Sequence, residues 1–144
     1  MPLNILKLCV GCESVEDLED WIAIKLDEKR RAGAPVEHFH TTRMAPKRVE
    51  ELIDGGSLYW IIKGGVQCRQ TLLEIRPFID AEGIGRCKLV LEPIVIRTEW
   101  QPRRPFQGWR YLAAADAPND LAGAESGEEM PLALRRELAE LGLL

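Results

Sequence analysis

Two strand-like segments separated by a pair of glycines constrain the fold of this chain most strongly. Residues 58–63 and 66–75 are rich in β-branched and aromatic side chains, and Gly64-Gly65 lies between them. Two-residue hairpin loops need positive φ angles, which glycine adopts at no steric cost. The sequence therefore predicts an antiparallel hairpin in which Trp60 lies opposite Arg69. Cross-strand neighbours share a face, so we expect a cation–π contact between these two side chains.

Four further elements are predicted before the hairpin. They are a strand at 4–10, a helix at about 15–32, a strand at 36–43 and a short helix beginning at Pro46. The long helix is the best specified, because Ser14 is a favourable N-cap with Asp17 in the capping-box position and Gly33 is a stop signal. Acidic residues in its first turn and basic residues in its last turn complement the helix dipole.

Strands dominate the chain after the hairpin. A strand is predicted at 86–95, and residues 113–130 are small and acidic without periodicity, as in a flexible linker. Residues 131–144 form a predicted helix with leucines on one side. This order predicts an α+β domain at 1–112 with a curved, mostly antiparallel sheet or small barrel. Two helices come from the N-terminal half, and the C-terminal helix is the third.

Composition narrows the class of protein. The chain has 144 residues, of which 46% are hydrophobic and 29% charged, as in an ordinary soluble domain with one core. No apolar run is long enough to span a membrane, and the N-terminus turns acidic too early for a signal peptide. A cytoplasmic location without a membrane partner is the expectation. Nucleotide-loop, zinc-protease and hydrolase motifs are absent, so no cofactor is predicted and enzymatic activity stays an open question.

Charge is distributed unevenly along the chain. The net charge is −4, yet residues 41–112 carry 12 basic against 8 acidic side chains. Aromatic residues alternate with the cations in 103–112, a mixture that suits phosphate binding and base stacking. The sequence predicts one surface that binds RNA or a nucleotide-type anion. Its residues would be Arg43, Lys47, Arg48, Trp60, Arg69, Arg103, Arg104, Trp109, Arg110 and Tyr111. The alternative is a solvated charged turn, with aromatics that anchor the last segment.

Two other functions compete with this prediction. A small hydrolase or transferase would use His40 as its base and Arg43, Lys47 and Arg48 as an anion clamp. A protein-interaction module or homodimer would instead use the C-terminal helix. Metal binding is a weaker alternative, since no second cysteine pair has matching spacing; its ligands would be Cys9, Cys12, His38 and His40. Cys68 and Cys87 fit buried strand positions.

The strings TRMxPKR, GGSLYW and FQGWRYL, at residues 42–48, 55–60 and 106–112, are distinctive. Together with the opening LKLCVGCESVEDL they resemble a small bacterial family of unknown function, which implies no particular activity. The β-rich middle with early helices is also similar, more distantly, to the PUA-like barrel class. That second resemblance implies binding of RNA or modified bases in a cleft beside the sheet, by analogy of fold alone.

Overall fold

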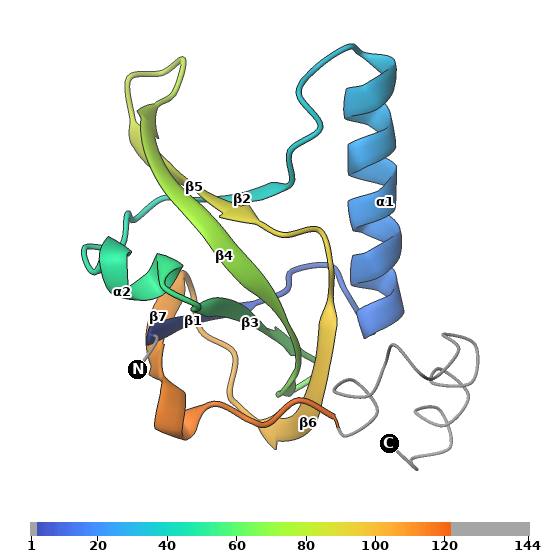
Figure 1. Cartoon of the computed structure of the whole chain (residues 1–144), viewed down its shortest axis with the longest axis vertical. Coiled ribbons are helices and arrows are strands. Elements are labelled where there is room, and N and C mark those ends of the chain that lie inside the picture. The colour runs from blue at the N-terminus through green and yellow to red at the C-terminus, as the bar shows by residue number, and fades with distance from the viewer. Residues whose placement is uncertain (1–2, 122–144) are drawn as a thin grey trace.

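The computed structural model describes residues 3–121 as two helices, seven strands and a 3-10 turn (Figure 1). In chain order these are β1 (Leu3–Leu8), α1 (Val15–Arg31), β2 (Phe39–Thr42), α2 (Val49–Ile53), β3 (Ser57–Ile62), β4 (Gly65–Ile79), β5 (Gly85–Leu91), β6 (Ile96–Pro102), β7 (Trp109–Ala113) and the turn Ala114–Asp116. The predicted α+β class is confirmed. The predicted C-terminal helix at 131–144 lies outside the described residues.

The seven strands form one curved, open sheet. Its order is β2-β5-β4-β3-β1-β7, and β6 also pairs with β4. All the pairings are antiparallel except that of β1 with β3, which are connected through α1, β2 and α2. The mostly antiparallel sheet is therefore confirmed. It does not close into a barrel, because β2 and β7 lie at opposite ends of the strand order.

The hairpin between β3 and β4 forms, but its register differs from the prediction. Ile62 pairs with Gly65, so the two loop residues are Lys63 and Gly64, with φ angles of 48° and 80°. A register shift between Trp60 and Ile61 follows, which places Trp60 opposite Cys68. The predicted pairing of Trp60 with Arg69 is therefore wrong.

Gly65 belongs to β4 and not to the turn, and a contact with another strand explains why this position is a glycine. A Cβ atom built on it would lie 2.3 Å from Nε1 of Trp100, because the indole of β6 covers this stretch of backbone. Gly65 is thus required for a close approach between β4 and β6. The positive φ angles that the turn needs fall one residue earlier, on Lys63 and Gly64.

Helix α1 begins and ends as predicted. The Ser14 hydroxyl accepts a hydrogen bond from the Asp17 amide (3.2 Å), and the Asp17 carboxylate accepts one from the Glu13 amide (2.9 Å). Gly33, with a φ angle of 70°, follows the last turn. The buried side chains of α1 face the larger hydrophobic core on one face of the sheet; they are Val15, Leu18 and Ile22.

A smaller core covers the other face of the sheet. It contains Leu6, Tyr59, Ile61, Val66 and Leu112, against which Phe106 packs. Cys68 and Cys87 are buried, as the sequence indicated. No helix within residues 3–121 is both long and apolar enough to cross a membrane.

Two strands escaped the sequence analysis, β6 and β7. β7 takes the place next to β1 at one end of the sheet. Part of the segment predicted as a linker is also placed in the structure. Ala113 ends β7, residues 114–116 form the 3-10 turn, and Asp120 makes a bridge to Thr98 of β6. The remainder of that segment, residues 122–130, lies outside the described residues.

Candidate ligand cavity

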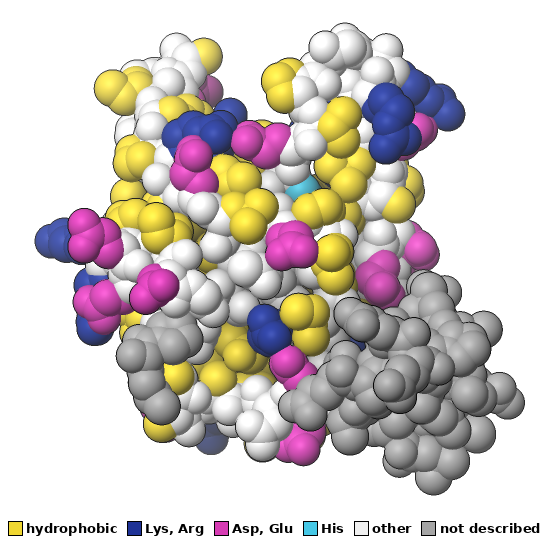
Figure 2. All heavy atoms as spheres, viewed as in Figure 1, with side chains coloured by type: hydrophobic (Ala, Val, Ile, Leu, Met, Phe, Trp, Pro, Cys, Tyr) yellow, Lys and Arg dark blue, Asp and Glu magenta, His cyan; other side chains and the backbone are white. Residues whose placement is uncertain are grey.

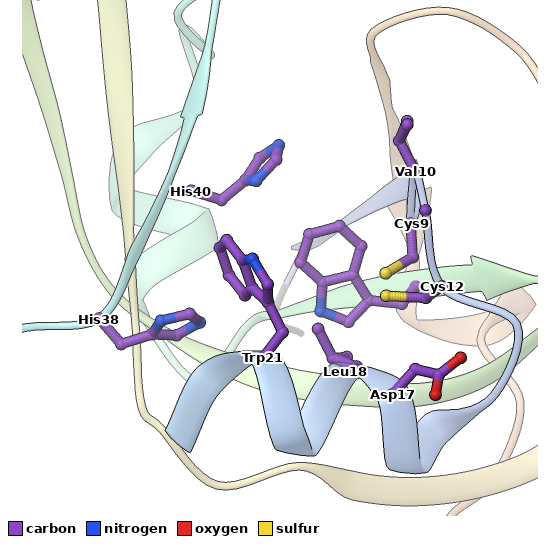
Figure 3. Close-up of a pocket in the computed structure, with 10 residues that line it drawn as sticks. Cys9, Val10, Cys12, Asp17, Leu18, Trp21, His38 and His40 are labelled. Carbon is purple, nitrogen blue, oxygen red and sulfur yellow. The ribbon is translucent and has the colours of Figure 1, made fainter. Parts of the chain in front are cut away.

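A cavity of about 350 Å³ lies between α1, the end of β1 and the sheet (Figure 3). Apolar and aromatic side chains dominate its wall, as is usual for small-molecule sites of this size. Its lining residues are Cys9, Val10, Gly11, Cys12, Asp17, Leu18, Trp21, His38, His40 and Trp60. In the space-filling view a histidine is visible among hydrophobic side chains beside α1 (Figure 2).

Strand alternation brings both histidines into the cavity. His38 and His40 flank Phe39 at the start of β2, and both line the cavity as the sequence predicts for one strand face. The Phe39 ring lies elsewhere, with the ammonium groups of Lys29 and Lys88 at 4.1 and 4.5 Å from its centroid. The two imidazoles thus lie in the cavity, whereas the Phe39 ring between them in the sequence lies beside two lysines.

Each histidine contacts a tryptophan edge-on. The His40 and Trp60 ring centroids are 5.2 Å apart at an interplanar angle of 90°, and those of His38 and Trp21 are 6.0 Å apart at 74°. The Trp60 indole is held in place, because its Nε1–H donates a 2.8 Å hydrogen bond to the side-chain oxygen of Gln70. Gln70 is itself buried and donates to the Glu92 carbonyl oxygen (3.0 Å).

Burial keeps both imidazoles uncharged at neutral pH. Desolvation lowers the pKa of His38 to about 4, and the nearby Lys29 acts in the same direction. Desolvation also lowers the pKa of His40 to about 4, followed by the effect of Lys7 and then of His38. A neutral imidazole offers one N–H donor and one nitrogen acceptor. The cavity therefore contains uncharged polar groups that can form hydrogen bonds with a ligand.

The two cysteines occupy the end of the cavity where β1 meets α1. Figure 3 shows their sulfur atoms side by side. Burial raises the pKa of the Cys9 thiol, and so does the hydrogen bond that its S–H donates to Cys12, so Cys9 is a protonated thiol at neutral pH. Although Cys9, Cys12, His38 and His40 line one cavity, no three His, Cys, Asp or Glu side chains in residues 3–121 are arranged to hold a metal ion.

A row of side chains connects the cavity to the sheet edge. Lys7 in β1 is paired with Trp60 of β3 on one side and with Trp109 of β7 on the other. Side chains paired across neighbouring strands lie on the same face about 5 Å apart. Burial lowers the pKa of Lys7. The positive charge of Lys7 in turn lowers the pKa of His40. Lys7 is thus a cation beside the cavity.

The two segments that the sequence combined into one basic surface are neighbours in the structure. The Trp109 indole donates a 2.7 Å hydrogen bond to the Met44 carbonyl oxygen. The Tyr111 hydroxyl accepts hydrogen bonds from the amides of Lys47 and Arg48, at 3.0 and 3.2 Å. An anion held by Arg43, Lys47 and Arg48 could have used these backbone donors, but the Tyr111 hydroxyl already accepts from both of them.

The predicted basic residues nevertheless do not form a single surface. Trp109 and Tyr111 lie on one face of β7, whereas Arg110 between them faces the opposite side, where its guanidinium stacks on Phe106. Arg69 donates two hydrogen bonds to the Asp120 carboxylate, at 2.8 and 2.7 Å. Strand alternation thus places Arg110 on the opposite face of the sheet from Trp109 and Tyr111, although the three residues are adjacent in the sequence.

The residues of the predicted hydrolase site are also separated. His40 lines the aromatic cavity, whereas Arg43 lines a different hollow together with Phe78 and Arg86. Arg48 is engaged by Glu51, which accepts a 3.0 Å hydrogen bond from its Nε. His40 thus has no arginine clamp in the described part of the chain.

Two residues at the cavity, Trp21 and Lys7, were not predicted as site residues from the sequence. Trp21 lies on the apolar stripe of α1 that the periodicity assigns to the core, yet its side chain is 43% exposed at the cavity. Lys7 interrupts an apolar strand, which is the one local signal that could have indicated a special role.

Fold and cavity together define an α+β domain with an open, curved, mostly antiparallel sheet and an aromatic cavity beside its long helix. The chain belongs to a family of proteins of unknown function, DUF1489, whose model matches residues 5–144. The resemblance seen in its sequence strings is thereby confirmed. No curated protein and no solved structure shows significant similarity to it.

Proposed function

We propose that the aromatic cavity binds a planar, uncharged heteroaromatic group of the nucleobase type, which makes this protein an RNA- or nucleotide-binding domain. One observation carries the proposal. Trp21 and Trp60 line a single cavity of about 350 Å³, each with a neutral histidine against its ring. Stacking on aromatic side chains is the common means by which proteins hold an unpaired base.

The polar groups of the cavity favour an uncharged ligand. His38 and His40 are neutral at physiological pH, and the Cys9 thiol is protonated. The Asp17 carboxylate also lines the cavity, but it accepts the Glu13 amide hydrogen at the start of α1. Imidazole nitrogens and thiols can donate hydrogen bonds to the polar edge of a base and accept hydrogen bonds from it.

A phosphate attached to such a base would lie outside the cavity. Lys7, which the strand register pairs with Trp60, is a cation that such a phosphate could contact. The resemblance of the sequence to PUA-like barrels implies the same ligand class by analogy alone, although this sheet does not close into a barrel. The base-stacking cavity differs from the exposed arginine surface that the sequence first indicated.

The proposal is tested by measuring the affinity of the protein for the four common nucleosides and for short single-stranded RNA. Trp21→Ala removes one stacking platform, and a loss of about 5- to 150-fold is expected from the typical contribution of one aromatic–base stack. Trp100→Ala is the matched control, because Trp100 is also exposed but covers Gly65 outside the cavity. It should leave the affinity unchanged. Equal losses in both variants, or no binding to the wild type, would refute the proposal.

A further inference from the structure

A second hollow, of about 300 Å³, lies beside β7 at the end of the sheet. Arg103, Arg104 and Arg110 line it together with Phe106 and Asp116. Leu6 and Leu112, which belong to the smaller core, also contribute to its wall, and Tyr111 lines it at the edge of the sheet. This hollow is therefore on the face opposite to the aromatic cavity, whose Trp60 wall belongs to the larger core.

Within residues 3–121, Arg103, Arg104 and Arg110 differ from most other arginines in lacking an acidic partner. Seven arginines in residues 3–121 form ion pairs with Asp or Glu: Arg30, Arg31, Arg48, Arg69, Arg76, Arg86 and Arg97. Arg103, Arg104 and Arg110 take part in none of the ion pairs of the described residues, although Asp116 lines the same hollow. Like charges gathered in one place repel each other, so the arrangement favours a bound anion.

Two of the three guanidinium groups are oriented by uncharged partners. The Arg110 guanidinium carbon lies 4.3 Å from the Phe106 ring centroid. Arg103 donates from Nε to the side-chain oxygen of Gln101 (3.1 Å), and its amide donates to the Gly64 carbonyl oxygen (2.9 Å). A ring below a guanidinium leaves its N–H edge free, and one bond at Nε leaves both terminal nitrogens free. These groups are held in place without being neutralised.

We propose that Arg103, Arg104 and Arg110 form a binding site for a phosphate group, separate from the aromatic cavity. Phosphate oxygens match the planar, forked donors of arginine, and orienting the donors in advance lowers the entropic cost of binding. The phosphate can belong to a free polyphosphate or to the phosphodiester backbone of a single strand. The site does not depend on the nucleobase proposal, since its residues lie on the other face of the sheet.

Titration of the full chain at low ionic strength with two probes tests this site. Pyrophosphate represents a free oxyanion, and a hexameric abasic oligodeoxynucleotide presents phosphodiesters without bases. Binding is followed by calorimetry and by the arginine Nε–H signals in ¹H–¹⁵N spectra. Arg110→Gln is expected to weaken binding of the preferred probe about 10-fold or more. Arg110→Lys keeps the charge but loses the forked N–H donors of the guanidinium, so its affinity for the probe should lie between those of the wild type and Arg110→Gln.

Arg48→Gln is the matched control. Arg48 also lies over an aromatic ring, that of Tyr111 at 5.7 Å, but Glu51 neutralises it. Arg48→Gln should change the affinity for the preferred probe less than 2-fold, and this result would support a specific site at Arg103, Arg104 and Arg110. Tighter binding of pyrophosphate identifies a free oxyanion as the ligand, and tighter binding of the abasic strand identifies a backbone; both support the site. Equal losses in the Arg48 and Arg110 variants, or no binding of either probe, would overturn it.

Discussion

The buried, uncharged histidines make folding stability depend on pH in a defined window. Each has a pKa of about 4 in the folded protein and an ordinary value of 6.5 when exposed. Between these values the unfolded chain binds more protons than the folded one, so acid favours unfolding. The stabilising effect is complete above pH 6.5 and is lost as the pH falls towards 4.

The size of the effect follows from the two pKa values. Between pH 7.5 and 5.0, each histidine is expected to remove about 2 kcal/mol from the free energy of unfolding, or about 4 kcal/mol for the pair. Carboxylates with lowered pKa values, such as those of Glu37 and Asp80, add their own loss only below about pH 5. The chosen window therefore isolates the histidines, and the chain contains only these two.

Urea denaturation at pH 7.5, 6.5, 5.5 and 5.0, followed by tryptophan fluorescence, measures the effect. His38→Asn should halve the loss of stability between pH 7.5 and 5.0, and so should His40→Asn. The comparison is made between two pH values within one variant, so the cost of the substitution itself cancels. If the wild type is equally stable at both pH values, or the imidazoles titrate near pH 6.5, the account of a desolvated cavity is refuted.

Two further predictions concern the framework around the cavity. Gly56→Ala places a methyl group 2.2 and 2.3 Å from backbone carbonyl oxygens of β1 and α2, so it should destabilise the fold by about 1–3 kcal/mol or more in thermal unfolding. Gly85→Ala, whose Cβ meets nothing within 4 Å, should change stability by less than about 0.5 kcal/mol, and similar costs for both would contradict the close contact. Arg69→Met should cost about 1–2 kcal/mol because it leaves the half-buried Asp120 unpaired. A double-mutant cycle with Asp120→Asn that shows no coupling would contradict this pairing.

Local signals in the sequence predict the local parts of the fold correctly. The capping residues of α1, Ser14 and Asp17, act within one turn, and the alternation at His38 and His40 depends only on strand geometry. Both were therefore readable without knowledge of the rest of the chain. The hairpin was predicted for the same reason, since positive φ angles are a local requirement.

The predictions from sequence are wrong or incomplete where contacts between residues distant in the chain determine the structure. The indole of Trp100 in β6 leaves no room for a side chain at Gly65, and β6 is a strand that was not predicted from the sequence. Arg69 finds its partner Asp120 at a separation of 51 residues. Trp21 looks like a core residue from its periodicity, and only the packing of α1 on the sheet brings it to the cavity. Such contacts leave no trace in local patterns of hydrophobicity and charge.

The four tryptophans allow one direct measurement of the central claim. Each indole N–H gives its own signal in a ¹H–¹⁵N spectrum, and Trp21 and Trp60 line the cavity whereas Trp100 lies outside it. Titration with the nucleoside that binds most tightly should shift the signals of Trp21 and Trp60 in a saturable manner and leave that of Trp100 unchanged. A spectrum without shifts, or one in which only Trp100 responds, would contradict a base-binding cavity.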